Sequence, residues 1–414
     1  MLRSGTVLYG LRNLQDSVHM KQGIHHALVL NLHQPAGNLE RLFDQRSWEA
    51  GEILCAMDRI ARSLWGQEDL ARVHLSISGT LLETLSDPGF QARAYGTVDC
   101  GSLLWYFQNQ ALFRILGTAY YHPVLPLIPE PDRDLQLRRW LGIGRHLFWR
   151  TAFQGFWPPE MGFCMELIPL LARLGYRYVV VDSEHIRPVT PMSWPELRYR
   201  PHRARHDGAE IVVVVRDRDL SNAQQSGMEA EWFIRELQDR TRHCDFVPLV
   251  TTATDGDNGG WFRNPDSRAN FWGLYRELLE RIRSGASPMR PDFIESYLDR
   301  YGVHGEVEVS TGAWNTGWHH GGGFLQWTGT AAQRDALARV VDTSRAVDKE
   351  RGRIGGIADT DAELDRLLEE ATWRLLRAET SCNFFWGEAW VDRAHEDLDA
   401  SWEKLRLVRY RSAV

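Results

Sequence analysis

The sequence predicts an α/β fold, in which a barrel-like domain of alternating strands and helices precedes a helical domain. Short apolar runs rich in β-branched residues recur up to about residue 330, and helix-period segments separate several of them. Beyond that point the chain holds long amphipathic segments with no strand between them. Continuous apolar runs that alternate with helices are typical of parallel strands buried on both faces. The later pattern favours helices that pack on one another.

Each element follows from its local pattern. The expected strands are residues 27–32, 73–77, 178–181, 211–215 and 247–251. The expected helices of the barrel include 165–174, 230–237 and 271–282, and those of the helical domain are 332–349, 362–380 and 393–406. A Gly- and Trp-rich segment, 311–329, joins the two parts. We therefore predict a disordered or weakly docked leader at 1–20, a catalytic barrel domain at 21–310 and a helical domain at 311–414 that contributes aromatic residues to the cleft.

Composition excludes several classes of protein. The net charge of −7, with charges of both signs interspersed, argues against a nucleic-acid-binding protein. The sequence contains no apolar run long enough to cross a membrane, and its first residues lack the pattern of a signal peptide. The five cysteines are widely spaced and odd in number, which indicates reduced thiols and a cytoplasmic location.

Polar side chains gather where the predicted strands end. His33, His122, Glu160, Asp182, Asp255 and Asp257 each follow or end an apolar run. Because the carboxyl ends of parallel strands meet at one rim of an α/β fold, we expect these residues to converge on one site. The stretch G-F-W-P-P-E, residues 155–160, is unusual among them because two prolines hold the backbone before a single carboxylate.

Five motifs in order carry a family resemblance. They are H-Q-P at 33–35, G-T-A-Y-Y-H-P-V-L-P-L at 117–127, G-F-W-P-P-E-M-G-F at 155–163, V-V-V-D at 179–182 and D-G-D-N at 255–258. Together they resemble glycoside hydrolase family 57, which contains α-amylases, amylopullulanases, 4-α-glucanotransferases and branching enzymes. The resemblance extends over nearly the whole chain after the leader. It implies a distorted (β/α)7 barrel with a C-terminal helical domain, and a cofactor-independent retaining enzyme whose partner is an α-glucan substrate.

The resemblance also implies residue roles. The family's nucleophile falls on Glu160 and its general acid/base on Asp255. The sugar-binding positions fall on His33, His122 and Asp182, and the aromatic segment that closes the subsite falls on Trp314. We expect Trp157 to add an apolar wall and Asp257 to support the site. Retaining cleavage of a glycosidic bond needs two carboxyl groups, one ionised to attack and one protonated to donate, so the residue chemistry agrees.

This chain departs from the family pattern at three places. Arg114 stands where the family carries a Glu, and Cys382 and Asn383 stand where an Asp and a Trp are expected. The segment around 318–323 is longer than the family form. We expect these departures to reshape the subsites that flank the catalytic pair, and hence acceptor choice and linkage preference.

Other interpretations stay open at this stage. One is a catalytically weak glucan-binding or regulatory member of the family, which the departures suggest. Another is a metal-dependent carbohydrate deacetylase, with His25, His26, His33 and His122 as ligands, although their spacing lacks a paired-histidine helix motif. We interpret Trp373, Trp386, Trp390 and Trp402 as packing residues of the C-terminal helices. Oligomeric state, chain-length preference and the choice between hydrolysis and transglycosylation are not fixed by the sequence.

Overall fold

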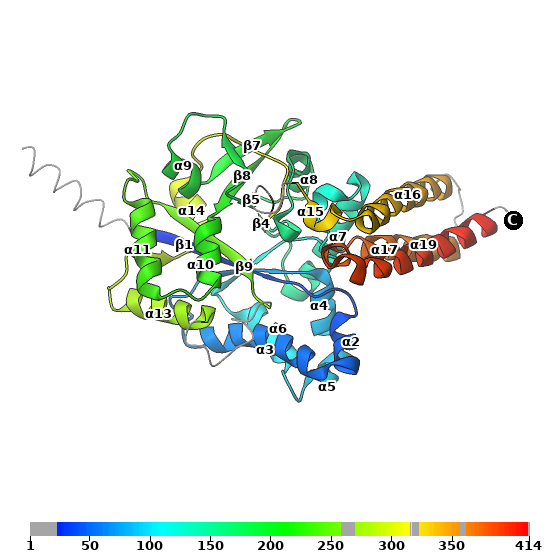
Figure 1. Ribbon diagram of the computed structural model, residues 1–414, viewed down its shortest axis with the longest axis horizontal. Helices are drawn as coiled ribbons and strands as arrows, with labels where there is room; N and C mark the ends of the chain where they lie inside the picture. The colour runs from blue at the N-terminus through cyan, green and yellow to red at the C-terminus, as the bar shows by residue number, and fades with distance from the viewer. Residues whose placement is uncertain (1–22, 258–269, 315, 317–322, 356–361, 413–414) are drawn as a thin grey trace, which may run out of the picture.

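A computed structural model describes residues 23–257, 270–314, 316, 323–355 and 362–412. The predicted leader and most of the segment 318–323 lie outside these residues. Figure 1 shows a rounded barrel region from which three long helices extend to one side.

Seven parallel strands form the barrel, in the spatial order β3-β2-β1-β9-β8-β5-β4. Their bounds are β1 Ile24–Leu32, β2 Val73–Ile77, β3 Phe113–Leu116, β4 Gly155–Phe156, β5 Tyr178–Asp182, β8 Ala209–Arg216 and β9 Leu249–Asp255. A parallel bridge between Gly117 and Phe156 brings the two edge strands together, so the barrel is nearly closed. The short β10 (Met289–Pro291) pairs with β1, β7 (His202–His206) pairs with β8, and β6 (Ile186–Pro188) pairs with β11 (Val307–Val309).

Each face of a barrel strand serves a different core. Ala27 and Val29 of β1 pack inside the barrel with Tyr178, Val180 and Trp157. The intervening Leu28 and Leu30 pack outward under the surrounding helices. Every residue of β1 is buried, which explains why its central residues, 27–30, form a continuous apolar run instead of an alternating one.

The barrel is covered by helices that follow its strands. They are α2 Asn38–Gln45, α3 Ser47–Leu64, α4 Gly79–Ser86, α5 Pro88–Ala94, α6 Cys100–Asn109, α7 Glu130–Phe148, α8 Ile168–Arg173, α9 Trp194–Tyr199, α10 Arg218–Gln225, α11 Ala230–Thr241, α13 Phe271–Arg283 and α14 Ile294–Tyr301. Short 3-10 turns lie at Leu125–Leu127 (η1), Pro159–Met161 (η2) and Met165–Leu167 (η3).

The C-terminal region is helical, as predicted. It contains α15 Leu325–Thr328, α16 Ala331–Ile354, α17 Ala362–Ala378, α18 Ser381–Phe385, η5 Gly387–Ala389 and α19 Val391–Arg411. A capping box between Thr330 and Gln333 starts α16. The hydrophobic cluster of the C-terminal region is distinct from the barrel clusters, but it includes Val124 of the loop after β3. The two regions therefore pack against each other at this boundary. The predicted fold class, a distorted (β/α)7 barrel with a C-terminal helical region, is confirmed, and the division at residue 310 stays a prediction.

Among the described residues, none of the helices combines the length and apolarity needed to cross a bilayer.

Candidate active site

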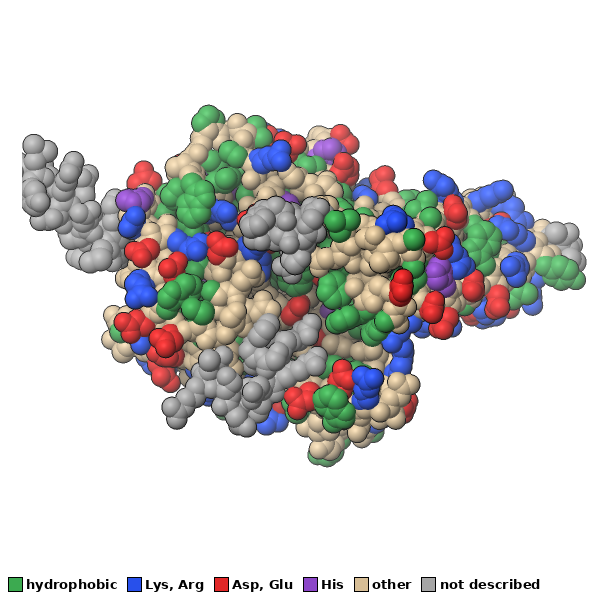
Figure 2. Space-filling view, viewed as in Figure 1, with side chains coloured by type: hydrophobic (Ala, Val, Ile, Leu, Met, Phe, Trp, Pro, Cys, Tyr) green, Lys and Arg blue, Asp and Glu red, His purple; other side chains and the backbone are tan. Residues whose placement is uncertain are grey.

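A cavity of about 420 Å³ lies where the barrel strands end and the helical region begins. In Figure 2, acidic side chains are visible in the hollow between these two parts of the molecule. The described residues that line it are Asn31, His33, Gln34, Pro35, Asn38, Arg41, Leu42, Gln45, Arg46, Glu49, Ile53, His122, Glu160, Asp255, Asp257, Trp314, Gln326, Cys382, Phe385, Trp386, Trp390 and Arg393. The volume is within the range of roughly 300–1,000 Å³ that is usual for small-ligand pockets.

Glu160 enters the cavity from the turn that follows β4. The residue has φ 55° and ψ 17°, a left-handed conformation that costs a non-glycine residue on the order of 1–3 kcal/mol. The backbone N–H of Trp314 donates to the carbonyl of Glu160 at 2.9 Å. Two donors hold its carboxylate: Trp314 Nε1–H reaches Oε2 at 2.7 Å and Ser381 Oγ–H reaches Oε1 at 2.7 Å. Glu160 is therefore held through both its backbone carbonyl and its carboxylate, in a 3-10 turn and not at the start of an α-helix.

Asp255 and Asp257 enter the same cavity from the end of β9. Asn31 of the neighbouring β1 donates from Nδ2 to Asp255 Oδ1 at 3.0 Å. Asp257 Oδ2 accepts from Gln34 Nε2 at 3.1 Å and from the backbone N–H of His33 at 3.3 Å. The register of β1 against β9, in which Asn31 faces Asp255, therefore fixes both carboxyl groups.

The three carboxyl groups share one electrostatic environment. Burial, followed by the negative charge of Asp255, raises the pKa of Glu160 to about 7. Burial alone raises the pKa of Asp255 to about 6, against the opposing effects of Asn31 and Arg216. Burial and the charge of Asp255 raise the pKa of Asp257 to about 7. Ionisation of one group thus disfavours ionisation of the others, which permits a proton to be retained in the cavity near neutral pH.

His33 and His122 stack face to face in the cavity wall, with ring centroids 4.0 Å apart. Burial, and then the neighbouring His122, holds the pKa of His33 well below its ordinary value, and burial lowers the pKa of His122 to about 3. Both imidazoles are therefore neutral at physiological pH. His122 Nδ1 lies 3.3 Å from Ser381 Oγ and 3.6 Å from Glu160 Oε1.

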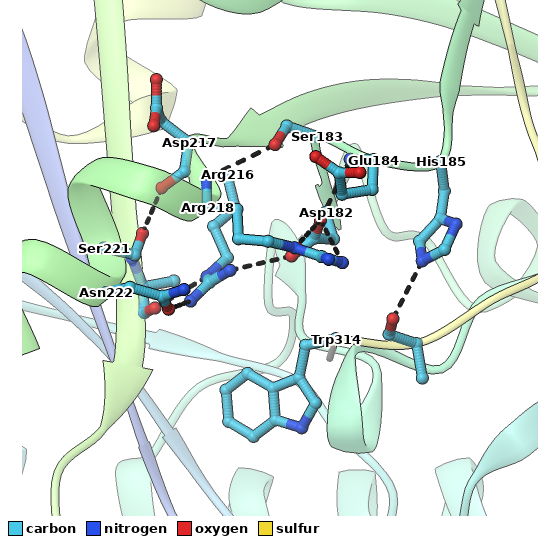
Figure 3. A network of polar contacts seen from close by, with 12 residues as sticks. Asp182, Ser183, Glu184, His185, Arg216, Asp217, Arg218, Ser221, Asn222 and Trp314 are labelled. Carbon is cyan, nitrogen blue, oxygen red and sulfur yellow. Dashed lines mark hydrogen bonds and ion pairs between the residues drawn. The ribbon is translucent and has the colours of Figure 1, made fainter. Parts of the chain in front are cut away.

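Two of the predicted site residues lie behind the cavity wall. Trp157 is fully buried and packs edge-on against Trp314, with ring centroids 5.7 Å apart. Asp182 is also buried, and its two oxygens pair with Arg216 Nη1 and Arg218 Nη2, each at 2.8 Å (Figure 3). Asp182 is not among the described residues that line the cavity, and its expected role as a sugar contact stays a prediction.

The three residues that depart from the family pattern lie in different places in the structure. Arg114 lies near the beginning of β3, with its guanidinium 4.1 Å from the ring centroid of Phe293. It is not among the described lining residues, and its expected effect on a flanking subsite stays a prediction. Cys382 does line the cavity, whereas Asn383 is buried and donates to the carbonyl of Ala378 at 3.1 Å.

The four histidines considered as metal ligands do not gather at one site, although His33 and His122 stack on each other. His25 and His26 lie near the opposite end of β1 from His33, where His25 Nδ1 contacts Asp292 at 2.7 Å and His26 Nε2 contacts Thr252 at 2.8 Å. Within the described ranges, three or more His, Cys, Asp or Glu side chains are nowhere arranged to hold a metal ion.

Several residues of the site were not found from the sequence. Ser381 is fully buried and contacts Glu160, but a serine in a helical segment carries no signal of that role. Trp386 and Trp390, which we interpreted as packing residues, line the cavity, and Trp386 is 54% exposed. The W-G-E-A-W spacing around a glycine, which breaks the helix between α18 and α19, was the signal that could have identified them.

The sequence of the chain matches that of a known family. The sequence profile described as Glycosyl hydrolase family 57 matches residues 27–283, which is more than half of the chain. The chain is 29% identical to a 4-alpha-glucanotransferase of Thermococcus litoralis over 196 residues, which cover 46% of this chain and 25% of that relative. It is 27% identical to an alpha-amylase of Pyrococcus horikoshii over 254 residues, which cover 61% of this chain and 36% of the relative. The matched part is thus about a quarter to a third of the length of these relatives.

Solved structures share the fold at low sequence identity. A GH57-type branching enzyme of Pyrococcus horikoshii superposes with a TM-score of 0.70 at 16% identity, over 94% of this chain and 88% of that one. The alpha-amylase AmyC of Thermotoga maritima superposes with a TM-score of 0.65 at 13% identity, over 95% and 97% of the two chains. These similarities extend through the helical region as well as the barrel.

Proposed function

The chain belongs to glycosyl hydrolase family 57, and from this premise we propose that it is a retaining enzyme that cleaves or transfers α-linked glucose chains. The names of its relatives, 4-alpha-glucanotransferase and alpha-amylase, support an α-glucan as the substrate class. The observation that carries the proposal is the meeting of Glu160 and Asp255, from two different strand ends, in the wall of one cavity.

Glu160 is the proposed nucleophile and Asp255 the proposed acid/base. In the first half-reaction Glu160 attacks the anomeric carbon, the glycosidic bond breaks, and Asp255 gives its proton to the departing oxygen. In the second half-reaction Asp255 takes a proton from water or from a sugar hydroxyl, which attacks the glycosyl-enzyme and releases Glu160. Hydrolysis and transglycosylation differ only in that acceptor.

The hydrogen bonds favour this division of roles, whereas the pKa values of the protein without substrate, about 7 for Glu160 and about 6 for Asp255, run in the opposite order, so the proposal requires substrate binding to reverse that order. Each carboxylate oxygen of Glu160 accepts a short hydrogen bond, one from Trp314 and one from Ser381, and such hydrogen bonds stabilise the ionised form of the carboxyl group. The described contacts of Asp255 give it one donor, Asn31 on Oδ1, which leaves Oδ2 available to carry a proton toward the leaving oxygen. The left-handed backbone at Glu160 holds the attacking group in place before substrate binds.

The other residues hold the sugar or support those that do. His33, His122, Asp257 and Trp314 line the cavity and are the proposed sugar contacts. Trp157 supports Trp314 from behind. Asp182 fixes Arg216, whose guanidinium lies 6.0 Å from the ring centroid of Trp314 and acts electrostatically on Asp255. Asp182 and Trp157 are therefore proposed as positioning residues.

Two substitutions and two substrates test the roles. Wild type, Glu160→Gln and Asp255→Asn are incubated with maltooligosaccharides and with an aryl α-maltoside whose leaving group needs no protonation. We expect Glu160→Gln to lose both activities, and Asp255→Asn to release the aryl group in a burst while losing activity on maltooligosaccharides. Proton NMR of the first product should show the α-anomer.

Product analysis then separates the alternatives. Amylose and pullulan, followed by reducing ends and by chain-length distribution, distinguish hydrolysis from transfer. Activity that persists in Glu160→Gln, or a β-anomeric first product, overturns the assignment. Loss of activity in EDTA overturns the metal-independent mechanism.

A further inference from the structure

The cavity that holds the carboxyl groups is also lined by cationic side chains from two separate parts of the fold. Arg41 lies on α2 and Arg46 follows that helix, while Arg393 lies in the first turn of α19. In Figure 1, α2 lies close to the base of α17 and α19, where the helical region joins the barrel. Trp386 and Trp390 line the cavity beside these arginines.

These arginines differ in how their charge is balanced. Arg46 Nη1 lies 3.5 Å from Glu49 Oε2, and Arg374 and Arg377 elsewhere in the helical region both pair with Asp397. No ion pair joins Arg41 or Arg393 to a carboxylate in the part of the chain that the structure describes, although Glu396, on the same helix as Arg393, acts favourably on its charge. The guanidinium carbon of Arg393 instead lies 3.3 Å from the ring centroid of Trp390.

The two unpaired guanidinium groups also act on each other. Burial, followed by the positive charge of Arg41, lowers the pKa of Arg393 to about 10. Two like charges that are partly desolvated at the wall of one cavity repel each other, and an anion bound between them would relieve this repulsion.

We propose that Arg41 and Arg393 form a phosphate subsite, which binds a phosphate monoester carried by a glucose unit in the cleft. This inference rests on the proposed α-glucan activity, and it extends the substrate class to phosphorylated glucans or glucose-containing sugar phosphates. One guanidinium fork satisfies the two oxygens of a carboxylate, whereas the tetrahedral oxygens of a phosphate accept from two forks at once. The indole faces of Trp386 and Trp390 provide the apolar surface on which the attached sugar ring packs.

Binding measurements in the Glu160→Gln background test the subsite without turnover. The probes are maltose, α-maltose 1-phosphate, maltose carrying a 6-phosphate, and inorganic phosphate, each titrated calorimetrically at low ionic strength. We expect at least one phosphorylated maltose to bind about tenfold more tightly than maltose, since hydrogen bonds to charged groups are the stronger ones. The advantage should shrink as salt is added.

Matched variants assign the effect to particular residues. Arg41→Gln and Arg393→Gln should each remove most of the tenfold preference, and the double variant should bind maltose and its phosphates equally. Arg41→Lys and Arg393→Lys should keep part of it, because they keep the charge but lose the fork. Arg46→Gln should keep the preference, because Glu49 already balances that charge. Melting temperatures and the affinity for unphosphorylated maltose show whether each variant is folded.

Defined outcomes overturn the inference. One is equal affinity of the Glu160→Gln protein, with both arginines intact, for maltose and for the two maltose phosphates. Another is a loss of preference in Arg46→Gln as large as the loss in Arg41→Gln or Arg393→Gln. Inorganic phosphate that binds as tightly as the sugar phosphates would assign the arginines to a free anion, which also overturns a sugar-borne phosphate. The activity of the wild type on unphosphorylated maltooligosaccharides is measured separately, so a failed glucan activity with an intact phosphate preference is distinguishable from the reverse.

Discussion

Glu160 is held by the protein in a state that is unfavourable in isolation. Its backbone is left-handed, its side chain is buried, and a second carboxyl group acts on it across the cavity. Its two hydrogen-bond donors, Trp314 and Ser381, offset part of that cost. The site therefore stores free energy in one residue, and removing the charge from that residue should stabilise the fold near neutral pH.

This balance predicts a specific dependence of stability on pH. The Glu160 carboxyl ionises at a pKa of about 4.5 in an unfolded chain and at about 7 in the folded protein. Between these values the folded state binds more protons, so the free energy of unfolding falls as pH rises through that window. The contribution of Glu160 to this fall is on the order of 3 kcal/mol.

Urea denaturation of wild type and Glu160→Gln at pH 5 and pH 7 measures that contribution. The wild type should lose more stability than the variant between the two pH values. Parallel pH profiles for the two proteins would contradict the argument, because Asp255 and Asp257 titrate in both.

At the scale of elements, the start of α18 places a hydrogen-bond donor, Ser381, against Glu160, the proposed nucleophile. Gln136 of α7 donates to the carbonyl of Leu376 at 2.9 Å and to Glu379 Oε2 at 2.8 Å. Burial, and then the charge of Asp132, holds the pKa of Glu379 well above its ordinary value. The contacts fix the chain just before Ser381, whose N–H donates to the carbonyl of His122 at 3.1 Å.

Replacement of Ser381 by Ala should therefore impair the chemistry more than the fold. Loss of a donor to Glu160 raises the pKa of that carboxyl further, so the acidic limb of the pH–rate profile should move to higher pH. We expect kcat/KM on maltooligosaccharides to fall about tenfold. The matched control is Ser401→Ala, which removes a buried bond to the carbonyl of Ala371 at 2.8 Å in the same helical region. An unmoved acidic limb, or equal losses in both variants, would refute the role of Ser381.

The elements themselves were largely predictable from the sequence. The apolar runs at 27–32, 73–77 and 178–181 fall in β1, β2 and β5, because strands buried on both faces consist almost entirely of apolar residues. The two-residue β4 gave no such signal, since it is too short to form an apolar run and its place is set by pairing with β5 and by the bridge to Gly117 after β3. The long C-terminal helices were expected, but α17 ends at Ala378 and not at residue 380. Near this end Gln136 of α7 donates to the carbonyl of Leu376, a tertiary contact that helix propensity does not predict.

At the scale of the whole molecule, the cavity is formed by segments that are remote in sequence. Motifs at strand ends predicted that Glu160 and Asp255 would meet, because barrel topology brings such ends to one rim. The same motifs did not reveal that the oxygens of Asp182 are occupied by Arg216 and Arg218, since burial and ion pairing depend on the neighbouring strand. Arg41 and Arg393 could not be paired from sequence either, because their proximity depends on how the helical region sits on the barrel.

A cavity built from two regions should fail when either region loosens. Leu398 of α19 is fully buried in the helical cluster, and its replacement by Ala should cost about 2–5 kcal/mol of stability. Since α18, the residue that follows it and α19 supply Ser381, Trp386 and Arg393, local loosening there would disturb the site while the barrel stays folded. We expect Leu398→Ala to lose activity in urea at a concentration below that at which circular dichroism reports the unfolding of the barrel.

The matched control is Leu237→Ala on α11, a leucine equally buried in the barrel cluster but on a helix that contributes no residue to the described cavity lining. Loosening at Leu237 weakens the support of the strands themselves, so activity and ellipticity should be lost together. A gap between the two transitions in Leu398→Ala that is absent in Leu237→Ala would show that the helical region controls the site as a separate unit of stability. Coincident transitions in both variants would mean that the two hydrophobic clusters unfold as one cooperative unit. The contacts at the boundary around Val124 would then be strong enough to prevent either cluster from unfolding alone.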